Sequence, residues 1–481
     1  MLKKIFLTNS SGIFCSRIFG FLRDLSTAYI LGAGMYSDIF FAAFKFPNLF
    51  RRIFGEGAFT QSFLPNFIAS SKKGAFSVVV LMIFTMILLI LSGLVVIFSG
   101  FFTKLLAWGF SDSMIEMAKP IVVINFWYLI LVFFVTFLSS LLQYKHSFWV
   151  SAYNTALLNI AMISALFIAK DKDSLQVVYY LSYGVLVGGV AQVCLHFYPL
   201  YTLGFFRLFY CGFKELRLAF FQTSAKSKIL ASQITDDLKS FFKQFFPAMI
   251  GSSTAQLASF IDTILASFLA SGSISYLYYS NRIFQLPLAI FAIAISSALF
   301  PMVAKMIKAK QEDKALEAMK KSFWFLFAML LFCTIGGIML SEQIIWLLYE
   351  HGEFSRSDTA ITAKVFSAYM IGLLPFGLSR IFSLYLYSYM KQTLAAKISA
   401  ISLFVGVIFS LILMYPFGAF GLAISGSLSG FVLFFLTIKA FGITKFYNIL
   451  KAQKFIILIL CATLLEIVIL SIWLMFVKIP R

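Results

Sequence analysis

Charged residues are scarce in this chain. Only 12% of its 481 residues are Asp, Glu, Lys or Arg, whereas 61% are hydrophobic and 18% are aromatic. Soluble domains carry about 25% charged residues, so this composition excludes a pair of soluble domains and predicts a polytopic membrane protein. Acidic residues are fewest, 19 against 39 Lys and Arg. Because the basic excess lies in short loops between apolar runs, we expect it to set the membrane topology rather than to bind nucleic acid.

Histidine and cysteine are also few, three and five respectively. The cysteines are scattered, with no CxxC pair and no His/Cys cluster, so the sequence predicts neither a disulfide framework nor a metal site built on them. A phosphatase or glycosyltransferase acting on lipid-linked sugars would need a His base or clustered acids, whereas His146, His196 and His351 are isolated. No repeated filter-like loop indicates a channel. These absences favour a transporter over an enzyme or a channel.

Apolar runs of about 20 residues, the length that spans a bilayer as a helix, fill most of the chain. The first run is interrupted by charges and no small-residue cleavage site follows it, so we expect a membrane span rather than a removed signal peptide. Thirteen spans are predicted, over residues 9–31, 36–66, 76–102, 117–144, 149–169, 176–199, 240–270, 275–306, 320–341, 360–388, 394–414, 418–438 and 455–477.

These spans predict an all-α membrane fold of four parts. Residues 1–199 are expected to form an N-terminal six-helix lobe and 238–440 a second one. Between them, 200–237 is a basic cytoplasmic linker with an interfacial amphipathic helix near FKELRLAFFQ, and 441–481 adds a basic loop and one further span. Lysines gather in alternate loops, which places the N-terminus on the cytoplasmic side and the loops at 170–173 and 350–354 on the opposite side.

The two six-helix sets are interpreted as an internal duplication. AYILGAGMYSDIFFAAFKF, from Ala28, aligns with ASFLASGSISYLYYSNRIF, from Ala266, and Gly34/Gly272 and Ser37/Ser275 match at one offset. Since six helices intervene, both copies enter the membrane in the same direction, which relates the two lobes by a pseudo-twofold axis along the membrane normal. Two lobes facing a central cleft are typical of a transporter that works by alternating access.

The first two predicted spans carry unusual charges. A charge near the bilayer centre costs about 2.5–3.5 kcal/mol on insertion scales, so it points into a bundle or a hydrated cavity. At a rise of about 1.5 Å per residue, Arg17 and Arg23 lie roughly 12 and 21 Å into the first span, and Asp24 can neutralise at most one of them. The full set is Arg17, Arg23, Asp24, Asp38, Lys45, Arg51, Arg52 and Glu56. We interpret this hairpin as one wall of a cationic cavity.

Structural roles are the alternative for part of this set. Asp38 and Lys45 lie seven residues apart on one helix face and would also suit a structural ion pair. Arg51 and Arg52 would also suit anchors that extend to the membrane surface.

Four stretches resemble the MviN/MurJ family of the multidrug/oligosaccharidyl-lipid/polysaccharide exporter superfamily, the lipid II flippases of bacteria. They are SRIFGFLRD at 16–24, LGAG at 31–34, SDIFFAAFKFPNLFRRIFGEGAFTQSFLP at 37–65 and FLASGSISYLYYSNRIFQLP at 268–287. The resemblance implies two six-helix lobes with additional C-terminal helices, located in the bacterial cytoplasmic membrane. It also implies that lipid II, an undecaprenyl-diphosphate-linked disaccharide pentapeptide, is moved from the inner to the outer leaflet through a cationic cavity.

The resemblance assigns roles to individual positions. The family's essential cavity arginines fall on Arg17, Arg23, Arg51 and Arg282. Further motif positions that the resemblance places at the substrate-binding site are Asp24, Asp38, Lys45, Asn48 and Glu56. A carboxylate that helps to hold sodium in some members corresponds to Asp262.

Two departures from the family bear on ion coupling. Gln285 stands where some members have Glu, and the span at 394–414 offers only serines as neutral polar side chains. We therefore expect no cofactor and a role for the membrane potential, with coupling to sodium or protons left open. The family's usual helix count is also larger than the number predicted here. The expected state is a monomer, with cell-wall synthesis or division proteins as candidate partners, and the alternative function is export of another polyprenyl-linked oligosaccharide or of drugs.

Overall fold

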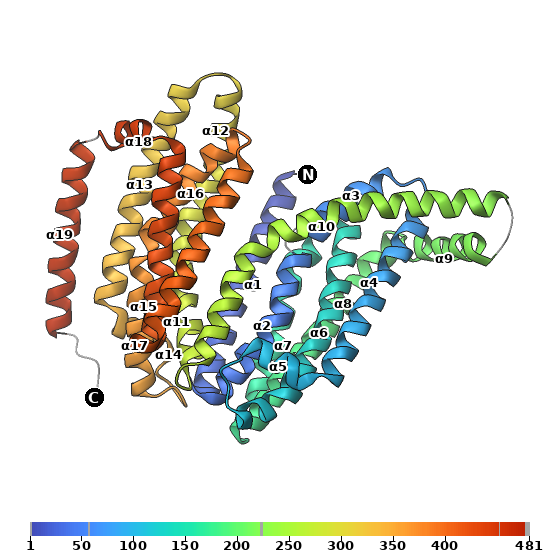
Figure 1. Ribbon diagram of the computed structural model, residues 1–481, viewed down its shortest axis with the longest axis horizontal. Coiled ribbons are helices and arrows are strands. Elements are labelled where there is room, and N and C mark those ends of the chain that lie inside the picture. The colour runs from blue at the N-terminus through green and yellow to red at the C-terminus, as the bar shows by residue number, and fades with distance from the viewer. Residues whose placement is uncertain (1, 56–57, 222–224, 452, 477–481) are drawn as a thin grey trace. The chain divides into compact units, whose positions relative to one another are not determined.

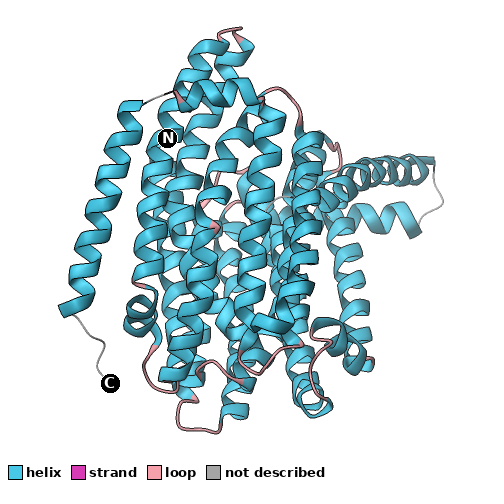
Figure 2. Ribbon diagram, turned by 60° about the vertical axis from the view of Figure 1, so that its left-hand side comes forward, coloured by secondary structure: helices cyan, strands magenta, loops and turns pink. Residues whose placement is uncertain are grey.

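The structure is a computed structural model that describes residues 2–55, 58–221, 225–451 and 453–476. Helices joined by short loops make up nearly all of this part of the chain, and no residue within it forms a strand (Figures 1 and 2). The all-α class expected from the apolar runs is confirmed.

The chain packs as two compact units. Unit 1 comprises Met1–Leu31 and Met35–Ile264, and unit 2 comprises Gly32–Gly34 and Leu265–Arg481. The helices that begin in unit 1 are α1 (Leu2–Leu31), α2 (Met35–Gly55), α3 (Ala58–Ala69), α4 (Lys73–Ile97), α5 (Ser99–Leu106), α6 (Asp112–Tyr144), α7 (Trp149–Ile168), α8 (Ser174–Thr202), α9 (Phe205–Phe221) and α10 (Ala225–Ser267).

Unit 2 begins with the last residues of α10. Its helices are α11 (Ser273–Pro287), the π-helical segment η1 (Leu288–Ile293), α12 (Ala294–Lys308), α13 (Glu312–Met339), α14 (Ser341–Tyr349), α15 (Arg356–Ile371), α16 (Leu373–Ser388), α17 (Gln392–Phe441), α18 (Ile443–Leu450) and α19 (Gln453–Phe476). The second helices of the two predicted repeats begin at equivalent places, since α2 follows Gly34 and α11 follows Gly272, the pair matched in the sequence.

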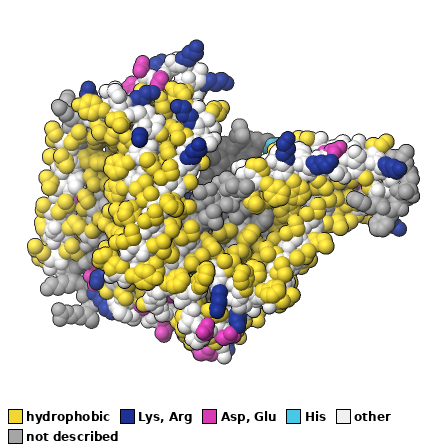
Figure 3. Space-filling view, viewed as in Figure 1, with side chains coloured by type: hydrophobic (Ala, Val, Ile, Leu, Met, Phe, Trp, Pro, Cys, Tyr) yellow, Lys and Arg dark blue, Asp and Glu magenta, His cyan; other side chains and the backbone are white. Residues whose placement is uncertain are grey.

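Most of the thirteen predicted spans coincide with apolar helices of the structure. Within the described residues, nine helical segments are long and apolar enough to cross a membrane. α1, α2 and α10, which hold the predicted spans at 9–31, 36–66 and 240–270, are not among them, and charged side chains interrupt the apolar sequence of α1 and α2. Apolar side chains cover most of the face that Figure 3 shows, and Lys and Arg side chains gather in a few groups among them. The predicted spans at 394–414 and 418–438 both lie in α17, which is divided at Gly418 (φ 57°), two residues after Pro416.

Helix α6 is the centre of unit 1. It packs against α2, α4, α5 and α8, and 72% of its most apolar stretch is buried. Phenylalanines of α3 and α4 pack on its Phe133: the ring centroids of Phe84 and Phe133 are 5.1 Å apart, and Phe59 lies 5.5 Å from both. In lipid, where helices gain little from hydrophobic burial, this close aromatic packing supplies dispersion energy. It gives unit 1 a rigid core.

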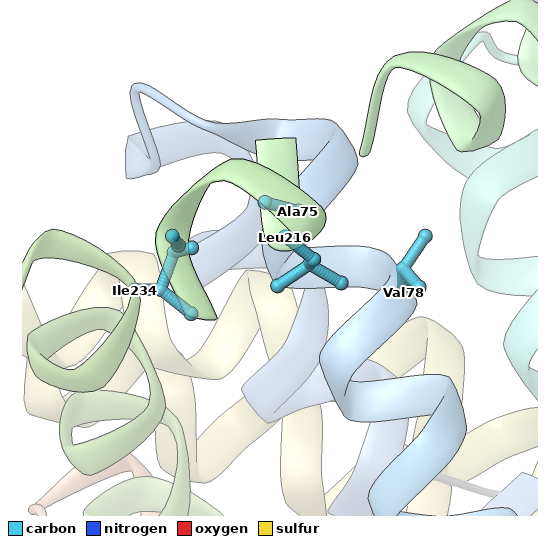
Figure 4. Close-up of a cluster of buried hydrophobic side chains, with 5 residues drawn as sticks. Ala75, Val78, Leu216 and Ile234 are labelled. Atoms are coloured by element: carbon cyan, nitrogen blue, oxygen red, sulfur yellow. The ribbon is translucent and has the colours of Figure 1, made fainter. Parts of the chain in front are cut away.

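The predicted linker at 200–237 is helical. It forms the end of α8, all of α9 and the first part of α10, and the predicted amphipathic helix lies within α9. The buried face of α9 packs on α4 and α10 through Leu216, which meets Ala75, Val78 and Ile234 (Figure 4). The opposite face of α9 exposes Arg207 and its other basic residues. The linker is therefore part of the packed structure of unit 1.

Two glycines set the distance between α4 and α9. A Cβ atom added to Gly212 would lie 2.4 Å from the backbone of Gly74, and one added to Gly74 would lie 2.6 Å from the Leu208 carbonyl oxygen. Both helices thus cross with their backbones in contact, which any side chain at either position would prevent.

We expect Gly212→Leu to destabilise the folded protein by about 1–3 kcal/mol, because the new side chain must force α9 away from α4. Thermal unfolding of the purified protein in detergent measures the change. Cys211→Leu is the matched control, since Cys211 is exposed on the same helix. An equal loss of stability in both variants would contradict the close crossing.

Candidate substrate-binding site

Helix α1 holds Arg23 and Asp24 against α7. The Arg23 Nη2 atom lies 2.6 Å from Asp24 Oδ1, and Arg23 Nε donates to the same oxygen at 3.1 Å. Arg23 Nη1 donates to Asn159 Oδ1 of α7 at 3.1 Å. The side chain of Asp24 is 1% exposed and that of Arg23 is 11% exposed. This guanidinium is therefore held by a carboxylate and an amide inside unit 1.

Arg17 lies in a different environment on the same helix. Its side chain is exposed, and it forms no hydrogen bond or ion pair with any residue in the described part of the chain. Arg17 and Asp24 are seven residues apart and lie on one helix face, yet Asp24 binds the adjacent Arg23, whose side chain reaches one carboxylate oxygen through two nitrogens. The carboxylate therefore neutralises Arg23 and leaves the charge of Arg17 available.

Helix α2 carries a second set of predicted residues. Lys45 Nζ donates to Ser259 Oγ of α10 at 2.6 Å, which links the two helices. Arg51 Nε donates to Asn48 Oδ1 one turn earlier at 2.9 Å, so the motif residue Asn48 orients this guanidinium. Asp38 is 2% exposed. Both cations on α2 thus donate hydrogen bonds to neutral oxygen atoms.

Asp262 lies three residues after Ser259, on the same face of α10, and its side chain is exposed. It is close enough to Lys45 for an electrostatic interaction. Within the described residues, no group of three His, Cys, Asp or Glu side chains could hold a metal ion. The sodium-binding role of Asp262 stays a prediction.

Arg282 lies on α11 in unit 2 and is half-buried. The helix is fixed to α15 by two hydrogen bonds, from Ser280 Oγ to the Thr362 carbonyl oxygen at 2.9 Å and from Tyr276 Oη to Asp358 Oδ1 at 2.8 Å. Asp358 also belongs to the capping box that begins α15. Arg282 is therefore carried by a helix whose position within unit 2 is well determined.

The predicted site residues are divided between the units. Arg17, Arg23, Asp24, Asp38, Lys45, Asn48, Arg51 and Asp262 belong to unit 1, Arg282 belongs to unit 2, and Glu56 lies outside the described residues. Convergence of the four arginines on one cavity stays a prediction.

Two residues that contact the predicted site residues were not predicted from the sequence. Asn159 binds Arg23, and Ser259 binds Lys45. Asn159 is the clearer omission, since a polar amide inside an apolar span is itself a signal of a buried partner.

We expect Asp24→Asn to lower the free energy of unfolding by about 3 kcal/mol, because it leaves the Arg23 charge largely buried without its counter-ion. Arg17→Ala should change it by less than about 0.5 kcal/mol, since the exposed side chain has no partner to lose. Chemical unfolding of both purified variants in detergent micelles makes the comparison. A large loss with Arg17→Ala would mean that Arg17 is structural.

The chain also matches a known protein family and individual relatives. The family model described as "Lipid II flippase MurJ" matches residues 27–479. A protein of Helicobacter pylori (strain ATCC 700392 / 26695) named "Probable lipid II flippase MurJ" is 56% identical over 443 residues, which cover 92% of this chain and 95% of that protein. A protein of the same name from Aquifex aeolicus (strain VF5) is 30% identical over 87% of this chain and 79% of its own length.

Solved structures show the same fold. The structure titled "Lipid II flippase MurJ, inward closed conformation" matches with a TM-score of 0.78 at 23% identity, over 99% of this chain and 94% of that chain. An inward-facing multidrug resistance MATE family transporter of the MOP superfamily matches with a TM-score of 0.66 at 14% identity, over 91% and 96%. The sequence matches, which extend over nearly the whole chain, go further than fold: this chain belongs to the lipid II flippase MurJ family.

Proposed function

We propose that this chain moves lipid II from the inner to the outer leaflet of the bacterial cytoplasmic membrane by alternating access. The observation that carries the proposal is the family match over residues 27–479, supported by 56% identity to the Helicobacter pylori relative. The protein is a multi-pass membrane transporter, and its action is movement of the substrate rather than chemical conversion.

A diphosphate headgroup cannot cross hydrocarbon unaided, because its unpaired charges would lose their hydration. The protein must therefore replace water with donors of its own. Arg17 suits this role, since its guanidinium is exposed, uncompensated and able to offer forked N–H donors to phosphate oxygens. Arg51 adds a second guanidinium, oriented by Asn48. In this proposal they act with Arg282 on the diphosphate while the polyprenyl chain stays in lipid.

Arg23 has a supporting part in this scheme. Its ion pair with Asp24 and its hydrogen bond to Asn159 tie α1 to α7, which fixes the depth at which Arg17 is presented. Lys45 ties α2 to α10 through Ser259 in the same way. Binding of an anion among the remaining cations would reduce their mutual repulsion and favour closure on the inner side.

The proposed orientation places the N-terminus in the cytoplasm. In unit 2, lysines follow the end of α12 and the end of α16, at Lys310 and Lys391, and Lys445 lies on α18. The region between α14 and α15, which follows the other end of α13 and precedes the continuous segment of α15 and α16, carries Glu350 and Glu353. Cytoplasmic loops of membrane proteins carry an excess of Lys and Arg, which favours this orientation.

The membrane potential is the proposed source of energy. An inside-negative potential favours outward movement of an uncompensated anion by about 2.3 kcal/mol per charge per 100 mV. Coupling to sodium or protons would add to this energy, with Asp262 as the proposed sodium site. We further propose that the protein acts as a monomer and delivers its product to proteins of cell-wall synthesis or division.

We expect Arg17→Ala to abolish lipid II export while leaving the protein folded, and Arg17→Lys to restore only part of it, because Lys lacks the forked donors. The measurement is made in cells depleted of the native protein, and asks on which leaflet the precursor accumulates. Arg207→Ala, on the exposed face of α9, is the matched control and should export normally. Full export by folded Arg17→Ala would refute the role of Arg17.

Export should also slow when the membrane potential is collapsed, by up to about 50-fold per transported charge at 100 mV. In proteoliposomes, lipid II movement is measured at a set potassium diffusion potential, with and without sodium. Equal rates at zero and at inside-negative potential would contradict potential-driven movement, and a rate that follows sodium alone would assign the coupling to the ion.

A further inference from the structure

Helix α19 is the least buried of the candidate membrane spans in the described chain. Only 11% of its most apolar stretch is buried, and Leu464 and Leu465 are 63% and 61% exposed. It packs chiefly against α13, through a face that includes Ile459 and Thr463, which are 4% and 9% exposed. Glu466 follows Thr463 by three residues on this face, and it is the one charged residue among 456–476.

The Glu466 carboxyl lies directly on the backbone of α13. A Cβ atom added to Gly336 would be 3.4 Å from Glu466 Oε1, so the absence of a side chain at Gly336 makes room for the carboxyl. Oε2 of Glu466 is buried and has no hydrogen-bond partner, and the same holds for the Thr463 hydroxyl. A carboxylate oxygen and a hydroxyl group, both buried and without a partner, therefore lie along the contact between α13 and α19, which we call the seam.

No cation compensates this carboxylate within the described residues. The titratable group that faces it from α13 is the thiol of Cys333, one turn before Gly336, which is half-buried. A carboxylate in the apolar layer with no counter-ion is costly, whereas the acid form removes the charge and supplies an O–H donor. The environment of Glu466 between α13 and α19 therefore favours the protonated carboxyl over the carboxylate.

We propose that the Glu466 carboxyl is a proton-binding site on the lipid-facing seam of α13 and α19. Its acid form holds α19 against α13 at Gly336, and loss of the proton draws the charged side chain away from the seam toward water. The site lies on helices other than α1, α2 and α11, which carry the cationic residues, and it does not depend on the proposed substrate.

A hydrophobic carbodiimide tests this assignment on the full-length purified protein. N,N′-dicyclohexylcarbodiimide dissolves in the apolar layer and reacts with carboxylic acids there. The carboxyl O–H adds across one C=N bond, with the proton going to nitrogen, and the O-acylisourea then rearranges to a stable N-acylurea. Peptide mass spectrometry locates the label. No lipid II is needed, so the result is separate from the test of transport.

At about pH 6 we expect at least about tenfold more label on Glu466 than on Glu342 or Glu350, because the penalty for a charge in the apolar layer exceeds the free energy that corresponds to tenfold. Those two side chains are suitable controls, since both pair with Arg356 and lie outside the apolar stretches. Label on Glu466 should fall several-fold by about pH 9, and Glu466→Gln should lose it.

Two results would overturn the proposal. If Glu466 reacts only after the protein is unfolded in detergent, the carboxyl is sealed between the helices and has a structural role. If its labelling is the same from about pH 6 to about pH 9, the group holds its proton throughout and does not exchange it.

Discussion

The ion pair between Arg23 and Asp24 holds the charged part of α1 in place within unit 1. A guanidinium in the apolar part of a helix needs a counter-charge or water, and here an adjacent carboxylate and the Asn159 amide supply its partners. The charges of Arg23 and Asp24 compensate each other and hold α1 in position, whereas Arg17 stays exposed and uncompensated. One helix thus carries an arginine that orders the structure and another that remains available to an anion.

Hydrogen bonds between neutral polar groups hold other helices of unit 1 together. His196 is fully buried: its Nδ1 donates to the Gln192 carbonyl oxygen at 2.7 Å, so its Nε2 accepts from Ser139 Oγ of α6 at 2.8 Å. Tyr128 of α6 donates to Gln192 Oε1 of α8 at 3.1 Å. His196 is therefore structural. Such bonds hold α6 and α8 in register where lipid provides no hydrophobic force.

In unit 2, hydrogen bonds and an ion pair likewise hold a helix in place. The short helix α18 is held by Trp324 Nε1, which donates to the Ile449 carbonyl oxygen at 3.0 Å, and by Lys320 Nζ, which donates to that of Lys451 at 2.8 Å. Lys445 completes the attachment through Glu312. α19 then follows with few buried residues of its own. Its single acidic residue is Glu466, whose buried Oε2 has no hydrogen-bond partner in the described part of the chain.

The sequence alone determined the membrane class, the positions of the apolar helices and the family, because the length of an apolar run and the order of motif residues are local properties of the chain. Only tertiary structure decided that Asp24 pairs with Arg23 instead of Arg17, that Asn159 and Ser259 are the partners of Arg23 and Lys45, and that the linker folds onto α4. These outcomes depend on which helices lie side by side and on how closely glycines such as Gly212 let their backbones approach, and residue spacing within one helix carries no information on either.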